Sequence, residues 1–164
     1  MALKIWFNGE LLEEKDINIS PFDHGFLYGD GTFEGIRAYS GRIFKCEEHV
    51  DRLYESAHSL KIDIPYTREE ITEFMKVTLR ANDLKDGYIR LVVSRGKGDL
   101  GIDPRRCDQG PTIAIIATAL ALYPEELYKK GLEVATATTR RIPVDSFNPR
   151  VKSLNYLNNI MGKI

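Results

Sequence analysis

The sequence has few of the residues that would tie it to disulfides, metals, nucleic acid or membranes. Its only cysteines are Cys46 and Cys107, and neither stands in a Cys-x-x-Cys or other metal-ligand spacing. We therefore expect no disulfide framework and no metal site, and a reduced compartment is the default. The formal net charge is only -1 at pH 7, which gives no electrostatic reason to expect a nucleic-acid or membrane partner.

Long apolar runs are absent as well. No stretch approaches the ~20 residues of a membrane-spanning helix, and the first residues, MALKIWFNGELLEEKD, become charged too early for a signal peptide. We therefore expect a cytoplasmic protein. The remaining composition, with 43% hydrophobic and 29% charged residues, is ordinary for a globular chain with a buried core.

Local patterns predict strands that alternate with two helices. Asn8 and Gly9 favour a type I′ hairpin turn, and the apolar run at 112–120 is typical of a strand buried on both faces. Thr67 and Glu70 form a capping box that begins a helix. The expected strands are 4–7, 11–12, 17–20, 32–39, 42–46, 88–95, 112–120 and 132–142. The expected helices are 47–60, 67–81 and one that starts at about residue 152.

The order of these elements favours an α+β fold. The composition changes around residues 122–130, where a proline and several charges follow the apolar strand. This change predicts a domain boundary. We expect one domain over residues 1–122, and a linker with the start of a second domain over residues 123–164.

Lys152 lies in an uncharged polar stretch. If a helix begins there, Asn155, Tyr156 and Asn159 share its face, and no carboxylate does. The macrodipole of such a helix disfavours a cation in the first turn, and a neutral amine is the form that attacks a carbonyl. The spacing therefore raises the hypothesis of a Schiff-base lysine. Spacing alone still favours the alternative, an exposed lysine in the first turn of a helix.

Four longer motifs follow one another along the chain. They read HGFLYGDGTFEGIRAY at 24–39, EEHVDRLYESAHSL at 47–60, GYIRLVVSRGKGDLGIDPRRC at 87–107 and PRVKSLNYLNNIMGK at 149–163. In this order they resemble the N-terminal part of the branched-chain amino acid aminotransferases, which are pyridoxal-phosphate enzymes of fold type IV. The resemblance covers essentially the whole chain. It implies that residues 1–122 form a small α/β domain on the substrate side, and that residues 123–164 open a larger β-rich cofactor domain.

The resemblance also implies three roles at the cofactor, pyridoxal 5′-phosphate. Lys152, in VKSLNY, matches the lysine that forms the Schiff base and moves the proton between the substrate α-carbon and the cofactor. Arg52, in HVDRLY, matches the arginine that binds the phosphate, and Tyr156 matches a tyrosine hydrogen-bonded to the 3′-oxygen. From spacing alone, Arg52 is better explained as a surface ion pair with Glu48 or Glu55, one helical turn away.

The strand at 88–95 contributes to the substrate side. Tyr88 and Arg90 lie two residues apart on one strand face, about 7 Å from each other, and a phenol beside a guanidinium suits a carboxylate. The resemblance implies that Tyr88 contacts the α-carboxylate and that Arg90 takes the side-chain carboxylate when glutamate is the amino donor. Phe33 resembles an apolar wall of the pocket, although core packing also explains it.

Three further residues complete the expected substrate side. Tyr28 and the loop around Ile102 resemble parts that reach into the site of a neighbouring subunit, so a homodimer or a higher homo-oligomer is implied. Core packing is the alternative for Tyr28. Arg37 lies on the FEGIR strand near the expected pocket, and the resemblance assigns it no definite contact.

The expected function is transamination of leucine, isoleucine and valine with 2-oxoglutarate or glutamate, so the partners are small amino acids and 2-oxo acids. D-amino acid aminotransferases share YGDGTFE and HVDRLY, but they carry an Arg-x-His pair after the SRG turn, where this sequence reads SRGKGDLGID. Aminodeoxychorismate lyases share KSLN with the D-amino acid aminotransferases. Both families stay alternatives, although the YIR strand and FEGIRAY favour the branched-chain enzymes.

A fragment without turnover is the alternative from another class. The related enzymes continue beyond the lysine motif, and their later half supplies further contacts to the cofactor. A chain of these 164 residues alone is therefore expected to hold the cofactor weakly and to transaminate little or not at all.

Overall fold

A six-stranded antiparallel sheet in the order β2-β1-β6-β5-β3-β4 forms the body of the protein. The computed structural model describes residues 2–119 and 123–164. The strands are β1 Lys4–Phe7, β2 Glu10–Glu13, β3 Gly31–Tyr39, β4 Arg42–Ile43, β5 Gly87–Ser94 and β6 Thr112–Thr118. The helices are α1 His24–Tyr28, α2 Cys46–Ser59, α3 Arg68–Ala81, α4 Glu125–Lys130 and α5 Leu157–Met161, with 3-10 turns at Glu14–Asp16 and Pro104–Arg106. The expected α+β fold is confirmed.

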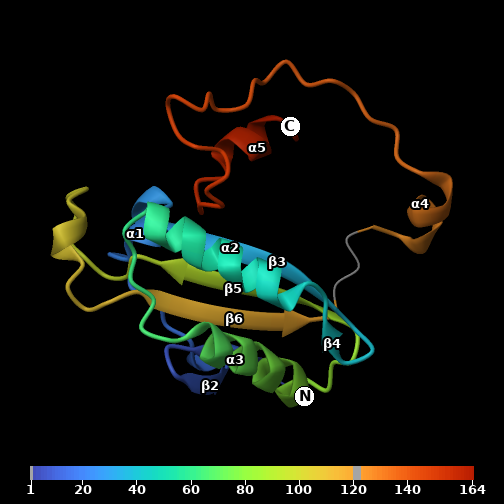
Figure 1. The fold of residues 1–164 in the computed structure, drawn as a ribbon, viewed down its shortest axis with the longest axis horizontal. Coiled ribbons are helices and arrows are strands. Elements are labelled where there is room, and N and C mark those ends of the chain that lie inside the picture. The colour runs from blue at the N-terminus through green and yellow to red at the C-terminus, as the bar shows by residue number, and fades with distance from the viewer. Residues whose placement is uncertain (1, 120–122) are drawn as a thin grey trace.

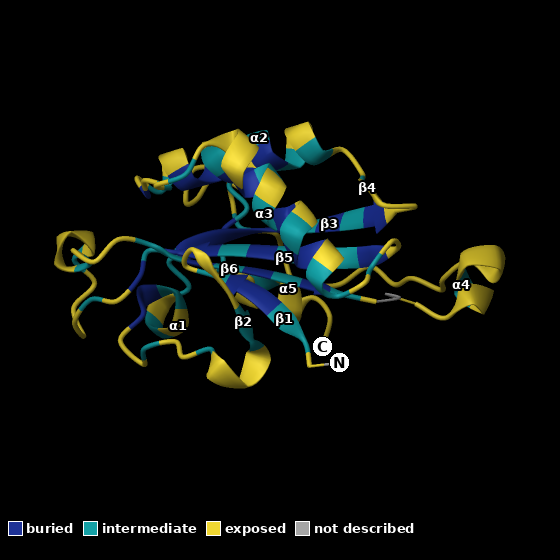
Figure 2. Ribbon diagram, turned by 90° about the horizontal axis from the view of Figure 1, so that it is seen from below, coloured by how far each residue is buried: buried dark blue, intermediate teal, exposed yellow. Residues whose placement is uncertain are grey.

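The two long helices α2 and α3 lie side by side on one face of the sheet (Figure 1). Figure 2 shows buried residues on the strands beneath these helices. Burial alternates along β5, so that Ile89, Leu91 and Val93 lie in the core while Tyr88 and Arg90 face the other side. The sheet therefore has one face closed by helices and a second face that carries polar side chains.

Turn and cap signals in the sequence are confirmed. Asn8 and Gly9 both have positive φ, 47° and 101°, as a type I′ turn between β1 and β2 requires. The Thr67 side chain accepts a hydrogen bond from the Glu70 backbone N–H, and the Glu70 carboxylate accepts one from the Thr67 N–H. This capping box satisfies two backbone donors at the start of α3.

The strand expected over residues 132–142 does not form. Its threonine-rich alternation suits a strand, but within the described residues no neighbouring strand pairs with it, and its side chains are almost all exposed. A strand without a partner leaves its N–H and C=O groups unpaired. Residues 17–20 also pair with no strand of the described sheet.

Two other strands differ from the prediction in extent. The strand expected at 42–46 has only two residues, because Lys45 adopts a left-handed conformation (φ 50°) and Cys46 begins α2. β6 has one face in the core, but its other face is half-buried and not fully covered as the apolar run predicts. Residue 120, the expected end of this strand, lies outside the described residues.

From residue 123 on, the chain passes through α4 and returns above α2 to reach α5 (Figure 1). The predicted boundary after residue 122 lies outside the described residues, so the division at 122/123 stays a prediction. No helix in the described ranges is both long and apolar enough to cross a membrane.

Replacing Thr67 by alanine should weaken α3. The alanine cannot accept the Glu70 N–H, so we expect the free energy of unfolding to fall by about 1 kcal/mol. Urea denaturation followed by circular dichroism measures this change. Thr67→Ser keeps the hydroxyl and is the matched control; an equal loss in both variants would contradict the role given to the cap.

Candidate active site

The segment around Lys152 pairs with the outer edge of β3. The Lys152 carbonyl accepts hydrogen bonds from the Phe33 N–H at 3.2 Å and from the Thr32 hydroxyl at 2.8 Å. Two residues on, the Leu154 N–H donates to the Gly31 carbonyl at 2.8 Å. These bonds add a short bridge to the sheet, and they fix the point from which the Lys152 side chain starts.

Helix α2 holds the same segment from the opposite side. The Lys152 N–H donates to the Ser56 hydroxyl at 3.1 Å. Ser56 itself is buried, one helical turn after Arg52, so both face the Lys152 segment. The backbone at Lys152 is therefore clamped between a strand edge and a helix.

The expected helix start at Lys152 is wrong. Helix α5 begins at Leu157, and Tyr156 occupies its N-cap position, so the macrodipole does not act on the amine as the spacing predicts. The strand-edge pairing, and not helical spacing, brings Lys152 beside Tyr156. Its Nζ donates to the Tyr156 hydroxyl at 3.2 Å.

Phe33 lies at the centre of the group. Its ring centroid is 4.4 Å from Lys152 Nζ and 4.6 Å from Arg90 Cζ, and the Tyr156 ring packs edge-on at 5.0 Å. An aromatic face attracts cations without forming an ion pair. Among the described residues, Lys152 makes no salt bridge to a carboxylate, in agreement with the uncharged stretch seen in the sequence.

Tyr88 and Arg90 lie on the open face of the sheet beside this group. Arg90 Cζ is 5.4 Å from the Tyr88 ring centroid. Tyr88 lies across from Arg37 in the β3–β5 register, and Arg37 Cζ lies 5.3 Å from the Tyr39 ring. The structure thus brings five expected residues onto one surface, namely Phe33, Tyr88, Arg90, Lys152 and Tyr156, with Arg37 further along β3.

Gly35 makes room for Tyr88. A Cβ atom at this position would lie 2.3 Å from the Tyr88 hydroxyl oxygen, closer than any real contact. The phenol therefore passes directly over the β3 backbone, and a larger residue at position 35 would displace it.

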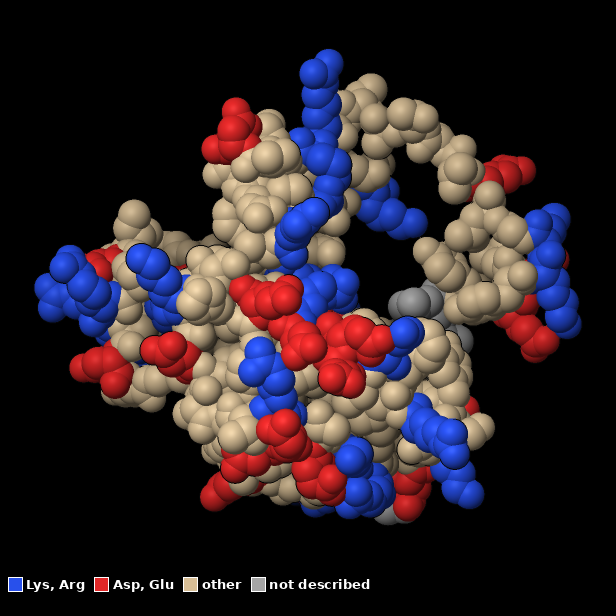
Figure 3. Space-filling view, viewed as in Figure 1, with Lys and Arg blue, Asp and Glu red and all other residues tan. Residues whose placement is uncertain are grey.

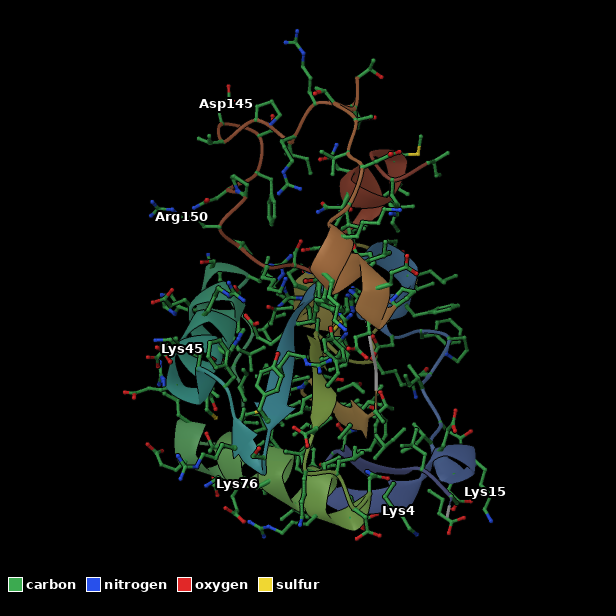
Figure 4. The ribbon with its side chains drawn as sticks, turned by 90° about the vertical axis from the view of Figure 1, so that its right-hand side faces the viewer. Lys4, Lys15, Lys45, Lys76, Asp145 and Arg150 are labelled. Carbon is green, nitrogen blue, oxygen red and sulfur yellow. The ribbon has the colours of Figure 1, made fainter. Side chains whose placement is uncertain are left out.

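A cavity of about 410 Å³ opens next to Lys152, between α2 and the segment that leads into α5. Figure 3 shows Lys and Arg side chains over this part of the molecule, with Asp and Glu gathered below them over α2. Figure 4 places Arg150 on the loop above α2, whereas Lys4, Lys15 and Lys76 lie at the opposite end of the molecule. The titratable side chains that line the cavity are Arg52, Glu55, Arg141, Arg150, Lys152 and Tyr156.

Arg52 does not form the surface pair that spacing favours. Its guanidinium makes two hydrogen bonds of 2.7 Å to the carboxylate of Glu34, while Glu48 pairs with Lys45. The hydrogen bonds to Glu34 raise the pKa of Arg52 above its ordinary value. The guanidinium at the cavity wall is therefore protonated, and the carboxylate of Glu34 is its partner.

Tyr28 and Ile102 are not among the residues that line the cavity beside Lys152. The Tyr28 hydroxyl donates to the Leu100 carbonyl, which ties α1 to the 95–107 loop. Ile102, on the same loop, is 80% exposed and lines none of the described walls around Lys152. The structure thus brings Tyr28 and the loop together, and Tyr28 lines a smaller cavity with Ser153 and Asn155.

A second, larger cavity of about 880 Å³ lies between β4 and the end of α3. Its lining includes Ile43, Leu79 and Arg80 but none of the expected site residues. We assign the candidate site to the smaller cavity because the Lys152 amine lines it.

Sequence patterns did not reveal the residues that hold the site together. Glu34, Thr32 and Ser56 contact Arg52 or the Lys152 backbone, and each is 15 or more positions away from its partner. One feature of the sequence could have indicated Glu34: it is a charged residue at a position of an apolar strand where the side chain is expected to face the core. Arg141 and Arg150, which line the cavity, carry no signal beyond their charge.

Known proteins resemble this chain over almost all of its length. The family model described as "Amino-transferase class IV" matches residues 31–164. A protein of Methanocaldococcus jannaschii called a putative branched-chain-amino-acid aminotransferase is 56% identical over 99% of this chain and 55% of its own length. The aminodeoxychorismate lyase of Bacillus subtilis is 39% identical over 97% of this chain and 53% of its own length.

Solved structures resemble the whole fold. The branched-chain aminotransferase of the thermophilic archaeon Thermoproteus uzoniensis, solved with norvaline, superposes with a TM-score of 0.86 at 32% identity, over 98% of this chain and 55% of that one. A branched-chain amino acid aminotransferase solved with pyridoxamine 5′-phosphate superposes with a TM-score of 0.89 at 32% identity, over 98% of this chain and 54% of that one. The likeness confirms the fold expected from the motifs. The chain spans about half the length of the curated relatives it matches.

Changing Gly35 to alanine should move Tyr88 without unfolding the protein. The added methyl meets the far end of a side chain, so we expect a destabilisation of about 1 kcal/mol, at the low end of overpacking costs, with a rotated phenol. A crystal structure and a thermal melt of the variant measure the two effects. Gly162→Ala, whose Cβ meets only ordinary contacts, is the control. An unmoved Tyr88 would refute the close approach.

Proposed function

The chain belongs to the class IV aminotransferase family, and from this premise we propose that its protein transfers amino groups between branched-chain L-amino acids and 2-oxoglutarate. Leucine, isoleucine and valine are the proposed donors, and Lys152 is the proposed Schiff-base lysine for pyridoxal 5′-phosphate. The observation that carries the proposal is Lys152, whose backbone is clamped and whose amine is hydrogen-bonded to Tyr156, at the wall of a cavity that Arg52 also lines. The proposal concerns the full-length protein.

The residues around the cavity fit a phosphorylated aldehyde. Arg52 has a guanidinium fixed at one wall, Arg141 and Arg150 add positive charge, and guanidinium groups bind phosphate through paired hydrogen bonds. Lys152 supplies the amine for the aldehyde carbon. When bound, the cofactor withdraws electrons from the α-carbon of an attached amino acid.

Lys152 and Tyr156 are proposed to act at the reacting atoms. Lys152 Nζ would accept the proton from the substrate α-carbon, which is general-base catalysis. Its 3.2 Å hydrogen bond with the Tyr156 hydroxyl holds the amine beside a second side chain that lines the cavity. Tyr156 is also proposed to donate to the 3′-oxygen of the cofactor.

The open face of the sheet is proposed to select the substrate. Phe33 gives an apolar wall for a branched side chain, and Arg90 lies over its ring, 4.6 Å from the centroid. The ring could therefore contact an aliphatic side chain, and the guanidinium beside it a glutamate carboxylate. Tyr88 is proposed to contact the α-carboxylate, and Arg37 to border the same pocket.

Two further parts of the proposal concern assembly and location. The exposed Ile102 and the Tyr28–Leu100 contact support a loop that reaches the site of a second copy, in a cytoplasmic homodimer. The small domain on the substrate side, residues 1–122, would then provide this loop. Cleavage of aminodeoxychorismate is the second candidate function, favoured by the 39% identity with a lyase. Assays with leucine and with aminodeoxychorismate separate the two reactions.

Replacing Lys152 by alanine should abolish covalent attachment of the cofactor. We expect the full-length protein with pyridoxal phosphate to absorb at roughly 400–430 nm, and the variant to lose this band. Borohydride reduction followed by peptide mass spectrometry should label the Lys152 peptide. Lys163→Ala, on the same exposed segment, is the control and should keep both signals. Unlabelled Lys152 in the loaded wild type would reject the proposed role.

Replacing Arg90 by leucine should separate the two half-reactions. Loss of a charged hydrogen bond to the side-chain carboxylate should slow the glutamate half-reaction at least about tenfold, while the leucine half-reaction changes little. Single-turnover kinetics with each substrate measures the ratio. Arg42→Leu, on the edge strand β4, should change neither rate. Equal losses for glutamate and leucine would count against this use of Arg90.

A further inference from the structure

Glu34 is a completely buried carboxylate in the middle of β3. Its exposed fraction is 0%, and its side chain points to the face of the sheet that α2 covers. Oε1 accepts a hydrogen bond from Arg52 Nε at 2.7 Å. Oε2 accepts one from Arg52 Nη2 at 2.7 Å and faces His49 Nδ1 at 2.8 Å. All three contacts come from two side chains of α2.

Stability alone does not account for this arrangement. Burying a carboxylate is costly, and replacing a buried ion pair with apolar residues of similar volume is often neutral or stabilising. The position is flanked on the same strand face by the buried residues Thr32 and Ile36, where an apolar side chain would pack. A charge at this point therefore suggests a function carried by its partner.

The partner is held in one orientation. Two nitrogens of the Arg52 guanidinium are bound to the two oxygens of one carboxylate, and this paired geometry fixes the plane of the group. The Arg52 side chain is nevertheless 47% exposed and lines the cavity beside Lys152. Within the described residues, Arg52 Nη1 makes no hydrogen bond, so its N–H groups are available to an anion in the cavity.

We propose that Glu34 is the positioning residue of the anion site: it aims the free N–H groups of Arg52 at the phosphate of the cofactor. The inference rests on the proposed function. Glu34 follows Phe33 directly, and neighbouring strand residues point to opposite faces. Phe33 contacts the Lys152 amine and Glu34 binds Arg52. Two consecutive residues of β3 therefore position the amine for the cofactor aldehyde and the guanidinium for its phosphate.

The test compares two ligands that differ only in the phosphate. Full-length protein freed of cofactor is titrated with pyridoxal phosphate and with pyridoxal, and absorbance gives both dissociation constants. Glu34→Gln should raise the dissociation constant of pyridoxal phosphate about tenfold and leave that of pyridoxal unchanged. Glu48→Gln, which alters an exposed carboxylate of α2 paired with Lys45, should change neither constant.

The outcomes separate the role of Glu34 from the function itself. If Glu34→Gln weakens both ligands equally, or neither, the positioning role is overturned while the cofactor site stands. If the wild type binds pyridoxal phosphate no better than pyridoxal, the proposed function fails and this inference fails with it.

A double variant tests the route of the effect and avoids an unpaired buried charge. Removing one partner of a buried pair is strongly destabilising, but removing both leaves no charge behind. The ratio of interest is the dissociation constant of pyridoxal divided by that of pyridoxal phosphate. In an Arg52→Gln background, Glu34→Gln should not lower this ratio any further, because Glu34 acts through Arg52. A further drop in the ratio would overturn the proposal.

Discussion

The pairing of the Lys152 segment with the edge of β3 is the contact on which the rest of the site depends. The Lys152 carbonyl receives two hydrogen bonds from Thr32 and Phe33, and its N–H is satisfied by Ser56. A buried backbone group that loses its partner is costly. The lysine therefore cannot shift along the strand without breaking several bonds together, and its side chain emerges at one place over the Phe33 ring.

The two faces of β3 carry different groups. The face covered by α2 and α3 carries the core and one buried carboxylate, while the other face carries Phe33 with the guanidinium of Arg90 above its ring. Because a strand alternates sides at every residue, a single short stretch can present groups to both. The strand is rigid, being paired along most of its length with β5, so the geometry of these groups is set by the sheet.

Local signals predict most helices and strands up to β6, because hairpin turns, capping boxes and apolar periodicity act over a few residues. The type I′ turn at Asn8, the capping box at Thr67 and the alternation along β5 are examples. The segment 132–142 was misjudged because strand composition does not supply a partner. At the site, the motifs identified the residue types, but the reason given for Lys152 was wrong because its neighbour Tyr156 is reached from an extended segment, before α5 begins. Pairs such as Glu34 with Arg52 are brought together only by the register of the strand against the helix, which a single sequence does not reveal.

Helix α2 couples two parts of the site mechanically. Arg52 and Ser56 stand one turn apart on this helix, and Arg95 ties its C-terminal end through the carbonyls of Leu60 and Lys61. The backbone hydrogen bonds of an α-helix fix the spacing of residues one turn apart. Any tilt of α2 therefore moves Arg52, at the cavity wall, together with Ser56, which binds the Lys152 N–H. The spacing of these two residues along the helix stays the same.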